Sequence, residues 1–216
     1  MSNVNLNVFA NLAGSGWSAI VSLAFIPLYI RLMGVEAYGL VGIFISLQAV
    51  FSVLDLGLSQ TLNRELAKLT VGDNNNKQIL DTVRTLEFVY LICAALVVVS
   101  IVVVSDYIAN DWLNPEVLSK KDIQVAIAIM AIVIGLRWPL TLYIGGLNGL
   151  QKQVLLNLIF AFFATIQALG AALALLLIDP TVQVFFVWQL VLAAVQLSAV
   201  RYVFFRFLPS GRARFS

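Results

Sequence analysis

The chain has 216 residues, of which 61% are hydrophobic and only 11% are charged, with a mean hydropathy of +0.97 and a net charge of +2. Because soluble domains carry about 25% charged residues, this composition excludes an ordinary water-soluble domain. The chain has no histidine and one cysteine. This excludes histidine-based catalysis, histidine metal sites and an internal disulfide, and we expect no cofactor and no nucleic-acid partner.

The hydrophobic residues are gathered into uncharged runs long enough to cross a bilayer, which takes about 20 residues of helix. Each run must be helical, because a lone strand leaves its backbone groups unpaired in lipid. The first run follows no basic segment and exceeds the roughly 7–15 residues of a signal-peptide core, so we expect a retained helix. The sequence therefore predicts an all-α integral membrane protein, a bundle of about six transmembrane helices. In chain order they cover residues 8–30, 37–58, 83–105, 123–146, 153–178 and 181–203.

Lysine and arginine are distributed unequally between the two sets of loops. Nine lie in the segments that share a side with the N-terminus, and three lie in the other loops. Since cytoplasmic segments carry the excess of basic residues, we predict that both chain ends are cytoplasmic. The nine are Arg64, Lys68, Lys77, Arg84, Lys152, Arg201, Arg206, Arg212 and Arg214. The three are Arg31, Lys120 and Lys121.

Polar residues recur inside the spans three or four positions apart, which places them on one helix face. Two explanations are open: seams where helices touch, which favour small and polar residues, or a water-filled cavity shared by several helices. Five of the six spans carry such a stripe, and this favours the cavity. The stripe members taken as cavity candidates are Gln48, Asp55, Thr141, Asn148 and Asn157.

Arg137 is the strongest single signal, because it lies about 14 residues into the fourth span, near the membrane midplane. An arginine there costs roughly 2.5–3.5 kcal/mol on insertion scales, and such residues often mark substrate pathways. It shares a face with Thr141 and Asn148, and the following Trp138 and Pro139 predict a kink. A purely structural pairing with an acid or with carbonyl groups is the equally weighted alternative.

Asp55 follows an uncharged run and precedes a short amphipathic segment that begins near Ser59. It lies at the predicted cytoplasmic end of the second span. There it could cap that segment, pair with Arg64 or Arg84, or guard the inner mouth of a cavity. We favour the structural roles, because acids at the end of a span reach water at little cost.

Three stretches resemble the polysaccharide biosynthesis, or O-antigen, flippases, which share a superfamily with multidrug and toxin extrusion transporters. They are "FIPLYIRLMGVEAYGL" at 25–40, "LDLGLSQTLNRELA" at 54–67 and "LRWPLTLYIGGLNGLQKQVLLNLI" at 136–159. The second is the most specific. In this family its Asp-Leu-Gly turn ends the second helix and leads into a cytoplasmic segment.

The resemblance implies flipping of an undecaprenyl-diphosphate-linked oligosaccharide from the inner to the outer leaflet of the bacterial inner membrane. It implies two lobes of six helices each around a central cavity, with Arg137 as the leading diphosphate contact and Arg64 near the inner mouth. Residues 1–208 resemble one N-terminal lobe, and 209–216 resembles the start of a cytoplasmic linker to a second lobe or chain. Relatives that move peptidoglycan precursors carry arginines inside the first helix, where this chain has serines and Trp17.

Three other functions stay open. A membrane enzyme acting on lipid-linked sugars would need paired carboxylates or a metal. The outer loop from Asp106 to Asp122 contains four acids, Asp106, Asp111, Glu116 and Asp122, but without histidine or a tight acid pair we favour a solvated loop there. A drug or cation antiporter would need deep acids, and of the acids Asp55 comes nearest to that position. A non-transporting membrane assembly protein is the third alternative.

Overall fold

The computed structural model describes residues 3–53, 57–69, 76–108 and 117–208. Within these ranges the chain forms helices and no strand, which confirms the predicted all-α fold. Six of the helices in the described part of the chain are long and apolar enough to cross a membrane, and α3 is the short exception. The helices are α1 (Asn3–Met33), α2 (Val35–Val53), α3 (Leu58–Leu69), α4 (Asn76–Tyr107), α5 (Lys120–Gly149), α6 (Gln153–Leu177) and α7 (Val182–Phe207).

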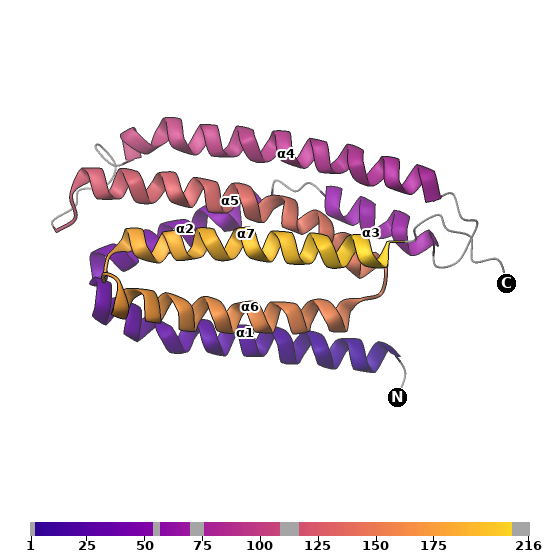
Figure 1. Cartoon of the computed structure of the whole chain (residues 1–216), viewed down its shortest axis with the longest axis horizontal. Coiled ribbons are helices and arrows are strands. Elements are labelled where there is room, and N and C mark those ends of the chain that lie inside the picture. Colours follow the sequence, from indigo (N-terminus) through magenta and orange to yellow (C-terminus); the bar gives the residue numbers. More distant parts are fainter. Residues whose placement is uncertain (1–2, 54–56, 70–75, 109–116, 209–216) are drawn as a thin grey trace.

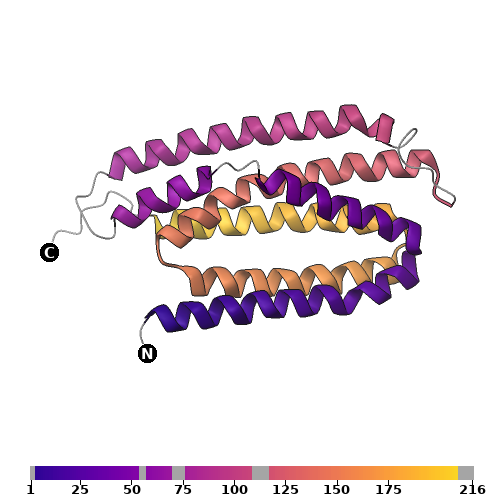
Figure 2. The same cartoon turned by 180° about the vertical axis from the view of Figure 1, so that it is seen from behind.

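The six long helices lie side by side and alternate in direction along the chain (Figures 1 and 2). One end of the bundle holds α3, the start of α1, the turn from α5 to α6 and the end of α7; we call it the α3 end. The turns from α1 to α2 and from α6 to α7 lie at the opposite end. Within each helix the backbone groups away from the ends bond mostly to one another, as a lipid environment requires.

Two hydrophobic clusters stack along the bundle, and α5 runs through both. The cluster at the opposite end is centred on residues such as Met130 and Phe186, and the cluster at the α3 end on Leu147 and Phe204. Trp138 packs against both clusters. The level of Trp138 in α5 is therefore the junction between two separately packed halves of the protein.

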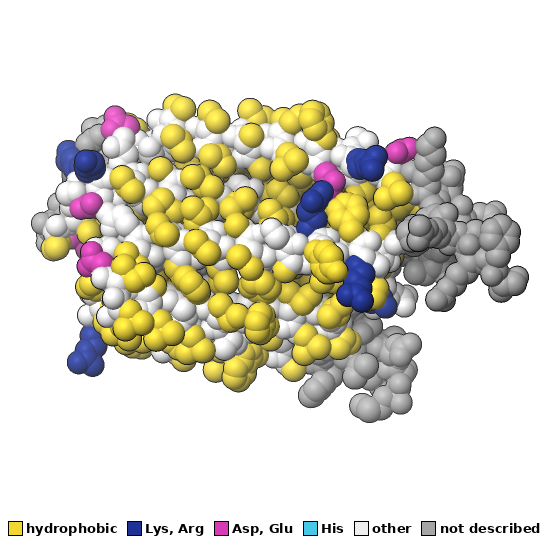
Figure 3. Space-filling model, viewed as in Figure 1, with side chains coloured by type: hydrophobic (Ala, Val, Ile, Leu, Met, Phe, Trp, Pro, Cys, Tyr) yellow, Lys and Arg dark blue, Asp and Glu magenta, His cyan; other side chains and the backbone are white. Residues whose placement is uncertain are grey.

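Around this core α5 packs against α3, α4 and α7, while α6 packs between α1 and α7. Large apolar side chains cover the outside of the bundle, for example Phe88 (65% exposed) and Leu158 (64% exposed). Figure 3 shows the visible charged residues gathered near the two ends, with hydrophobic side chains between them. This surface suits a protein whose middle contacts lipid and whose ends contact water.

The short amphipathic segment expected near Ser59 is α3, which begins at Leu58 after Gly57 in a left-handed conformation (φ +79°). Its buried residues Leu62 and Leu66 face the α3-end cluster, and its other face carries charged and polar side chains. Asp55 lies outside the described residues, so its expected capping and pairing have no structural account.

The helix bounds differ from the expected spans in several places: α1 begins at Asn3 rather than near residue 8, and α2 ends at Val53 rather than near residue 58. The helix α4 begins at Asn76 rather than near residue 83, because its first turns pack beside α3 while the apolar run starts later. The helix α5 continues through Pro139 to Gly149, and Figures 1 and 2 show its second half inclined to its first half. Proline removes a backbone donor inside a helix, and this accounts for a bend without a break.

Candidate functional site

Arg137 projects from the middle of α5 into a ring of glutamine side chains from three other helices. Its Nη1 donates to the Oε1 atom of Gln48 in α2 at 3.2 Å. Its Nη2 donates to Oε1 of Gln189 in α7 at 3.0 Å and to Oε1 of Gln167 in α6 at 3.5 Å. Four helices thus meet at one guanidinium group near the junction of the two hydrophobic clusters.

The partners of Arg137 are neutral. None of the described carboxylates lies within ion-pair distance of it, and the ring of Phe44 adds a cation–π contact at 5.6 Å. Amide oxygens and an aromatic face stabilise a guanidinium without cancelling its charge. The described surroundings therefore leave a net positive charge deep within the bundle.

A cavity of about 340 Å³ opens beside this charge, between α1, α2, α6 and α7. Arg137, Gln48, Gln167 and Gln189 all line it. Its further polar lining comes from Ser22, Tyr29 and Tyr38. The Tyr29 hydroxyl donates to the Ala168 carbonyl oxygen at 3.0 Å, which fixes one wall of the cavity.

A second cavity of about 190 Å³ lies on the other side of Arg137, between α2 and α5, and we call it the α2–α5 pocket. Arg137 and Gln48 line this pocket as well as the larger cavity. The other members of its lining are Phe51, Ser52, Ile134, Trp138 and Thr141. Arg137 consequently stands between two spaces, both of which carry polar groups at the level of the membrane core.

A comparison with protein-family models matches residues 5–216, nearly the whole chain, to the family described as polysaccharide biosynthesis protein. The chain belongs to this polysaccharide biosynthesis family. The resemblance seen in the sequence is thereby confirmed. No curated protein and no solved structure matches the chain. With its six membrane-crossing helices within the described residues, this member of the family is a multi-pass membrane protein.

Three of the residues expected to line a cavity in this family member come together. Gln48 bonds to Arg137, and Thr141, one turn after Arg137, lines the α2–α5 pocket. The Thr141 hydroxyl donates to the Trp138 carbonyl oxygen at 2.7 Å, a bond within the helix. The spacing of four residues in α5 was therefore a correct guide to a shared face.

Of the remaining expected residues, the three that the structure describes lie apart from this site. Asn148 is eleven residues beyond Arg137, roughly 16 Å along α5, and lines neither of the two cavities. Asn157 donates to the Asn11 side chain in the seam between α6 and α1. Arg64 is exposed on α3, and Asp55 is outside the described residues.

Gln167 and Gln189 lie within the fifth and sixth predicted spans, but nothing in the sequence paired them with Arg137. Gln189 is only 3% exposed, and a buried glutamine in a membrane helix calls for a partner. Nothing in the sequence indicated that Phe44 would contact Arg137, because a phenylalanine in an apolar helix is not distinctive.

A second polar cluster joins α4, α5 and α7 nearer the α3 end. The Tyr143 hydroxyl donates to Oε1 of Glu87 at 2.5 Å, and Arg201 Nε lies 3.2 Å from the same oxygen. Arg201 Nε also donates to the Tyr143 hydroxyl at 3.1 Å. Because Glu87 is engaged by both neighbours, this cluster resembles a tie between helices more than a cation site.

Acids at the opposite end fix loops and helix starts. Glu36 accepts from the backbone N–H groups of Val117 and Leu118 at 2.8 and 3.1 Å. Asp122 caps the start of α5 together with Ser119, and also accepts from Gln183 at 2.8 Å. No group of three potential metal ligands occurs among the described residues. Glu36 and Asp122 thus have structural partners.

Proposed function

We propose that this chain forms part of a transporter that moves an undecaprenyl-diphosphate-linked oligosaccharide from the inner to the outer leaflet for surface polysaccharide synthesis. The observation that carries the proposal is Arg137, a midspan cation between two cavities with only neutral partners among the described residues. Membership of the polysaccharide biosynthesis family supports the substrate class.

The chemistry of the larger cavity suits such a substrate. A guanidinium presents a planar fork of donors that matches phosphate oxygens, and it stays charged at any physiological pH. The glutamine amides and tyrosine hydroxyls around it are uncharged donors and acceptors, which suit sugar hydroxyl groups. A diphosphate at Arg137 would pair with its positive charge, while the neutral lining would allow the glycan to leave again.

The proposal assigns this six-helix bundle the role of one lobe, paired with a second lobe in the same protein or in another chain. Transporter sites generally lie between two repeats. Polar groups in a cavity exposed to lipid on one side are costly, and a second lobe would cover them. In this proposal the lining residues bind the lipid-linked oligosaccharide and let it move, and they break no bond in it.

The test is export of lipid-linked oligosaccharide in cells that depend on the complete protein. Arg137→Ala should abolish export while the protein remains inserted in the membrane, since Ala offers no donor. Arg137→Lys should retain part of the activity, because the charge persists without the fork. Arg206→Ala, which removes an exposed arginine at the end of α7, is the matched control and should export normally.

Normal export by inserted Arg137→Ala protein would refute the proposal. Loss of export through failure to insert, for both Arg137→Ala and Arg137→Lys, would instead make Arg137 a packing residue. Quantifying each variant in the membrane fraction separates these two results.

A further inference from the structure

One strip of the central helix α5 reaches the surface of the bundle. Val125 and Ile132, about two helical turns apart, are 42% and 43% exposed and so lie on one open face of α5. Figures 1 and 2 show α4 and α7 on either side of α5, with α2 behind it in the view of Figure 1. We call the surface around Val125 and Ile132 the α5 strip.

The cluster of Glu87, Tyr143 and Arg201 marks where this strip ends toward the α3 end. Tyr143 is about three turns beyond Ile132 and therefore shares its helix face. Its hydroxyl contacts Glu87 of α4 and Arg201 of α7, which places these two helices beside the strip. Gly135, at the centre of α5, is roughly 12 Å from Tyr143 along the axis, and the hydrocarbon core extends about 15 Å from its middle. The cluster thus lies close to the level at which lipid head groups begin.

Arg201 offers two open nitrogen atoms at this level. Its Nε donates to the Tyr143 hydroxyl at 3.1 Å and lies 3.2 Å from Oε1 of Glu87, and the ring of Phe205 lies 5.2 Å from its Cζ. Neither Nη atom bonds to a residue that the structure describes, and the side chain is 55% exposed. A guanidinium held in this way needs little reordering to bind a phosphate group.

Arg84, about one turn before Glu87 on α4, adds a second cation. It is exposed, and none of the described carboxylates lies within ion-pair distance of it. Asp81 is a further turn toward the α3 end, where water and salt screen its charge, and Glu87 is engaged by Arg201. At the head-group level the two arginines therefore exceed the neighbouring acid Glu87 by one charge.

An apolar strip with arginines at one end suits an amphiphilic anion. Leu91, one turn past Glu87 on α4, and Val187, about four turns before Arg201 on α7, extend the apolar surface on both sides. The strip from Ile132 to Tyr143 is roughly 16 Å long, which is the depth of one leaflet. An acyl chain can cover this length while its phosphate reaches the arginines. Inorganic phosphate would leave the strip uncovered, and a zwitterionic lipid would bring a further cation.

We propose that the α5 strip binds an anionic phospholipid, with an acyl chain along Ile132 and its phosphate at Arg84 and Arg201. Glu87 and Tyr143 are positioning residues in this site, because they fix Nε of Arg201 and leave its Nη atoms open. The site is on the outside of the bundle, on a different face of α5 from Arg137, and it does not rest on the proposed transport function.

Native mass spectrometry of the full-length protein in detergent counts the lipids that stay bound and gives their apparent Kd. Phosphatidylglycerol should occupy one site at least fivefold more tightly than phosphatidylcholine, whose head group has no net charge. Arg84→Gln should weaken phosphatidylglycerol binding about fivefold, the usual contribution of one basic residue near anionic lipid. Arg206→Gln, which removes an exposed arginine on another face of α7, is the matched control and should bind as the parent does.

Glu87→Gln separates a lipid site from a tie between helices. The variant keeps an oxygen that accepts from Tyr143 and Arg201 but removes the negative charge beside Arg201. Phosphatidylglycerol should then bind about fivefold more tightly, while the affinity for phosphatidylcholine stays unchanged. A cluster that only holds α4, α5 and α7 together would show no such gain.

Several results would overturn the lipid site. Equal affinity for phosphatidylglycerol and phosphatidylcholine is one, and undiminished phosphatidylglycerol binding by folded Arg84→Gln protein is another. An unchanged or lower affinity in folded Glu87→Gln protein would exclude a role for Arg201. Displacement of the lipid by inorganic phosphate would show that the strip is not used, and binding of undecaprenyl phosphate without phosphatidylglycerol would assign the surface to a different lipid.

Discussion

Tyr143 shows how a single hydroxyl can hold three helices in lipid. Its ring is buried (4% exposed), and its hydroxyl lies between Glu87 of α4 and Arg201 of α7. Hydrogen bonds to charged groups contribute roughly 1.5–3 kcal/mol each, more than bonds between neutral groups. Arg201 is largely exposed, so its ion pair with Glu87 adds less than the bond from Tyr143.

Tyr143→Phe should therefore lower the free energy of unfolding by about 2 kcal/mol, since the ring is kept while the bond to Glu87 and the weaker bond from the exposed Arg201 are lost. Thermal unfolding in detergent measures the change. Tyr202→Phe, at an exposed tyrosine on α7, is the control and should unfold at the parent temperature. Equal stability of Tyr143→Phe and the parent would show that the cluster holds nothing together.

The sequence predicted Arg137 as a candidate site residue, but it did not predict which side chains surround it. A lone charge in a long apolar run stands out because lipid penalises it wherever the helix is placed. Its contacts with Gln167 and Gln189 depend on how α6 and α7 are rotated about their axes, and packing across helices sets those rotations. Asn148, on the expected face of α5, lies too far along the helix to reach the same site.

Among the elements, α3 and α5 bring their backbones close together. Gly145 and Gly149, four residues apart on α5, face the backbone of α3. A Cβ atom at Gly145 would overlap the Ser59 carbonyl oxygen, and one at Gly149 would overlap the Asn63 carbonyl oxygen. Small residues at this spacing let two helix backbones approach within a membrane protein.

Replacing either Gly145 or Gly149 with alanine should destabilise the protein by about 1–3 kcal/mol, because the α3 backbone has to move away. Protease cleavage within α3, followed against temperature, measures its detachment. Gly39→Ala is the matched control, because a Cβ atom there meets nothing within 4 Å. It should be neutral or slightly stabilising, since alanine favours helix over glycine. Unchanged α3 protection in both Gly145→Ala and Gly149→Ala would contradict the tight contact.

The sequence predicted α3 as a short amphipathic segment beginning near Ser59, and the helix begins at Leu58, directly after Gly57. It did not predict the early start of α4, because the turns before residue 83 are polar and are held by α3 rather than by lipid. Hydropathy detects only the part of a helix that lipid surrounds. Helix ends that pack on other protein in the interfacial region carry no such signal.

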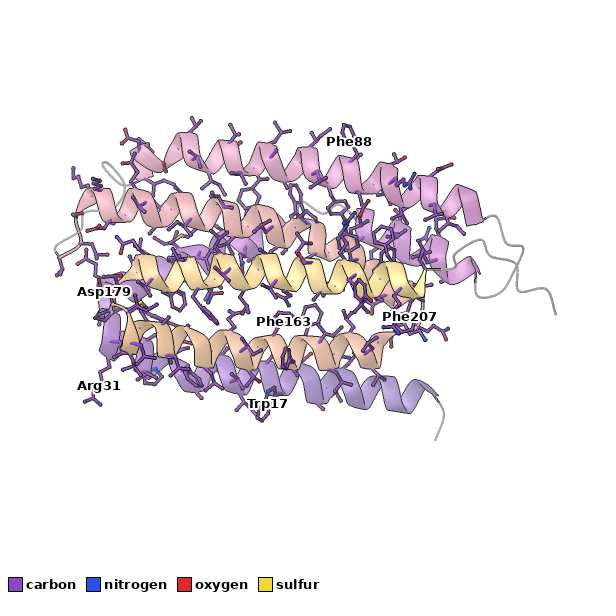
Figure 4. All side chains as sticks on the ribbon, viewed as in Figure 1. Trp17, Arg31, Phe88, Phe163, Asp179 and Phe207 are labelled. Carbon is purple, nitrogen blue, oxygen red and sulfur yellow. The ribbon has the colours of Figure 1, made fainter. Side chains whose placement is uncertain are left out.

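For the whole molecule, charge separates the two ends of the bundle. The described arginines and lysines of α3, α4 and the end of α7 lie at the α3 end, whereas Arg31, Lys120 and Lys121 lie at the opposite end. Figure 4 shows Arg31 and Asp179 at one end and Phe207 at the other. The excess of basic residues at the α3 end predicts that this end is cytoplasmic.

Single cysteines introduced into a Cys93→Ala background test this orientation in intact cells. A membrane-impermeant maleimide should label Asp179→Cys, at the opposite end, and should not label Gln60→Cys, on the exposed face of α3. Labelling of both after the membrane is permeabilised is the control for reactivity. The reverse pattern in intact cells would invert the predicted topology.

Pro139 weakens the backbone hydrogen bonding of α5 at one turn in the middle of the helix. The ring leaves the Gly135 carbonyl without its usual helical donor, and this happens where Trp138 joins the two hydrophobic clusters. If one half of the bundle tilts against the other, we expect α5 to bend at this level rather than along its whole length. Arg137 is two residues away and is tethered to α2, α6 and α7, so its bonds are the first to be stretched or slackened. The weakest section of the central helix and its most deeply placed charge thus occupy the same turn.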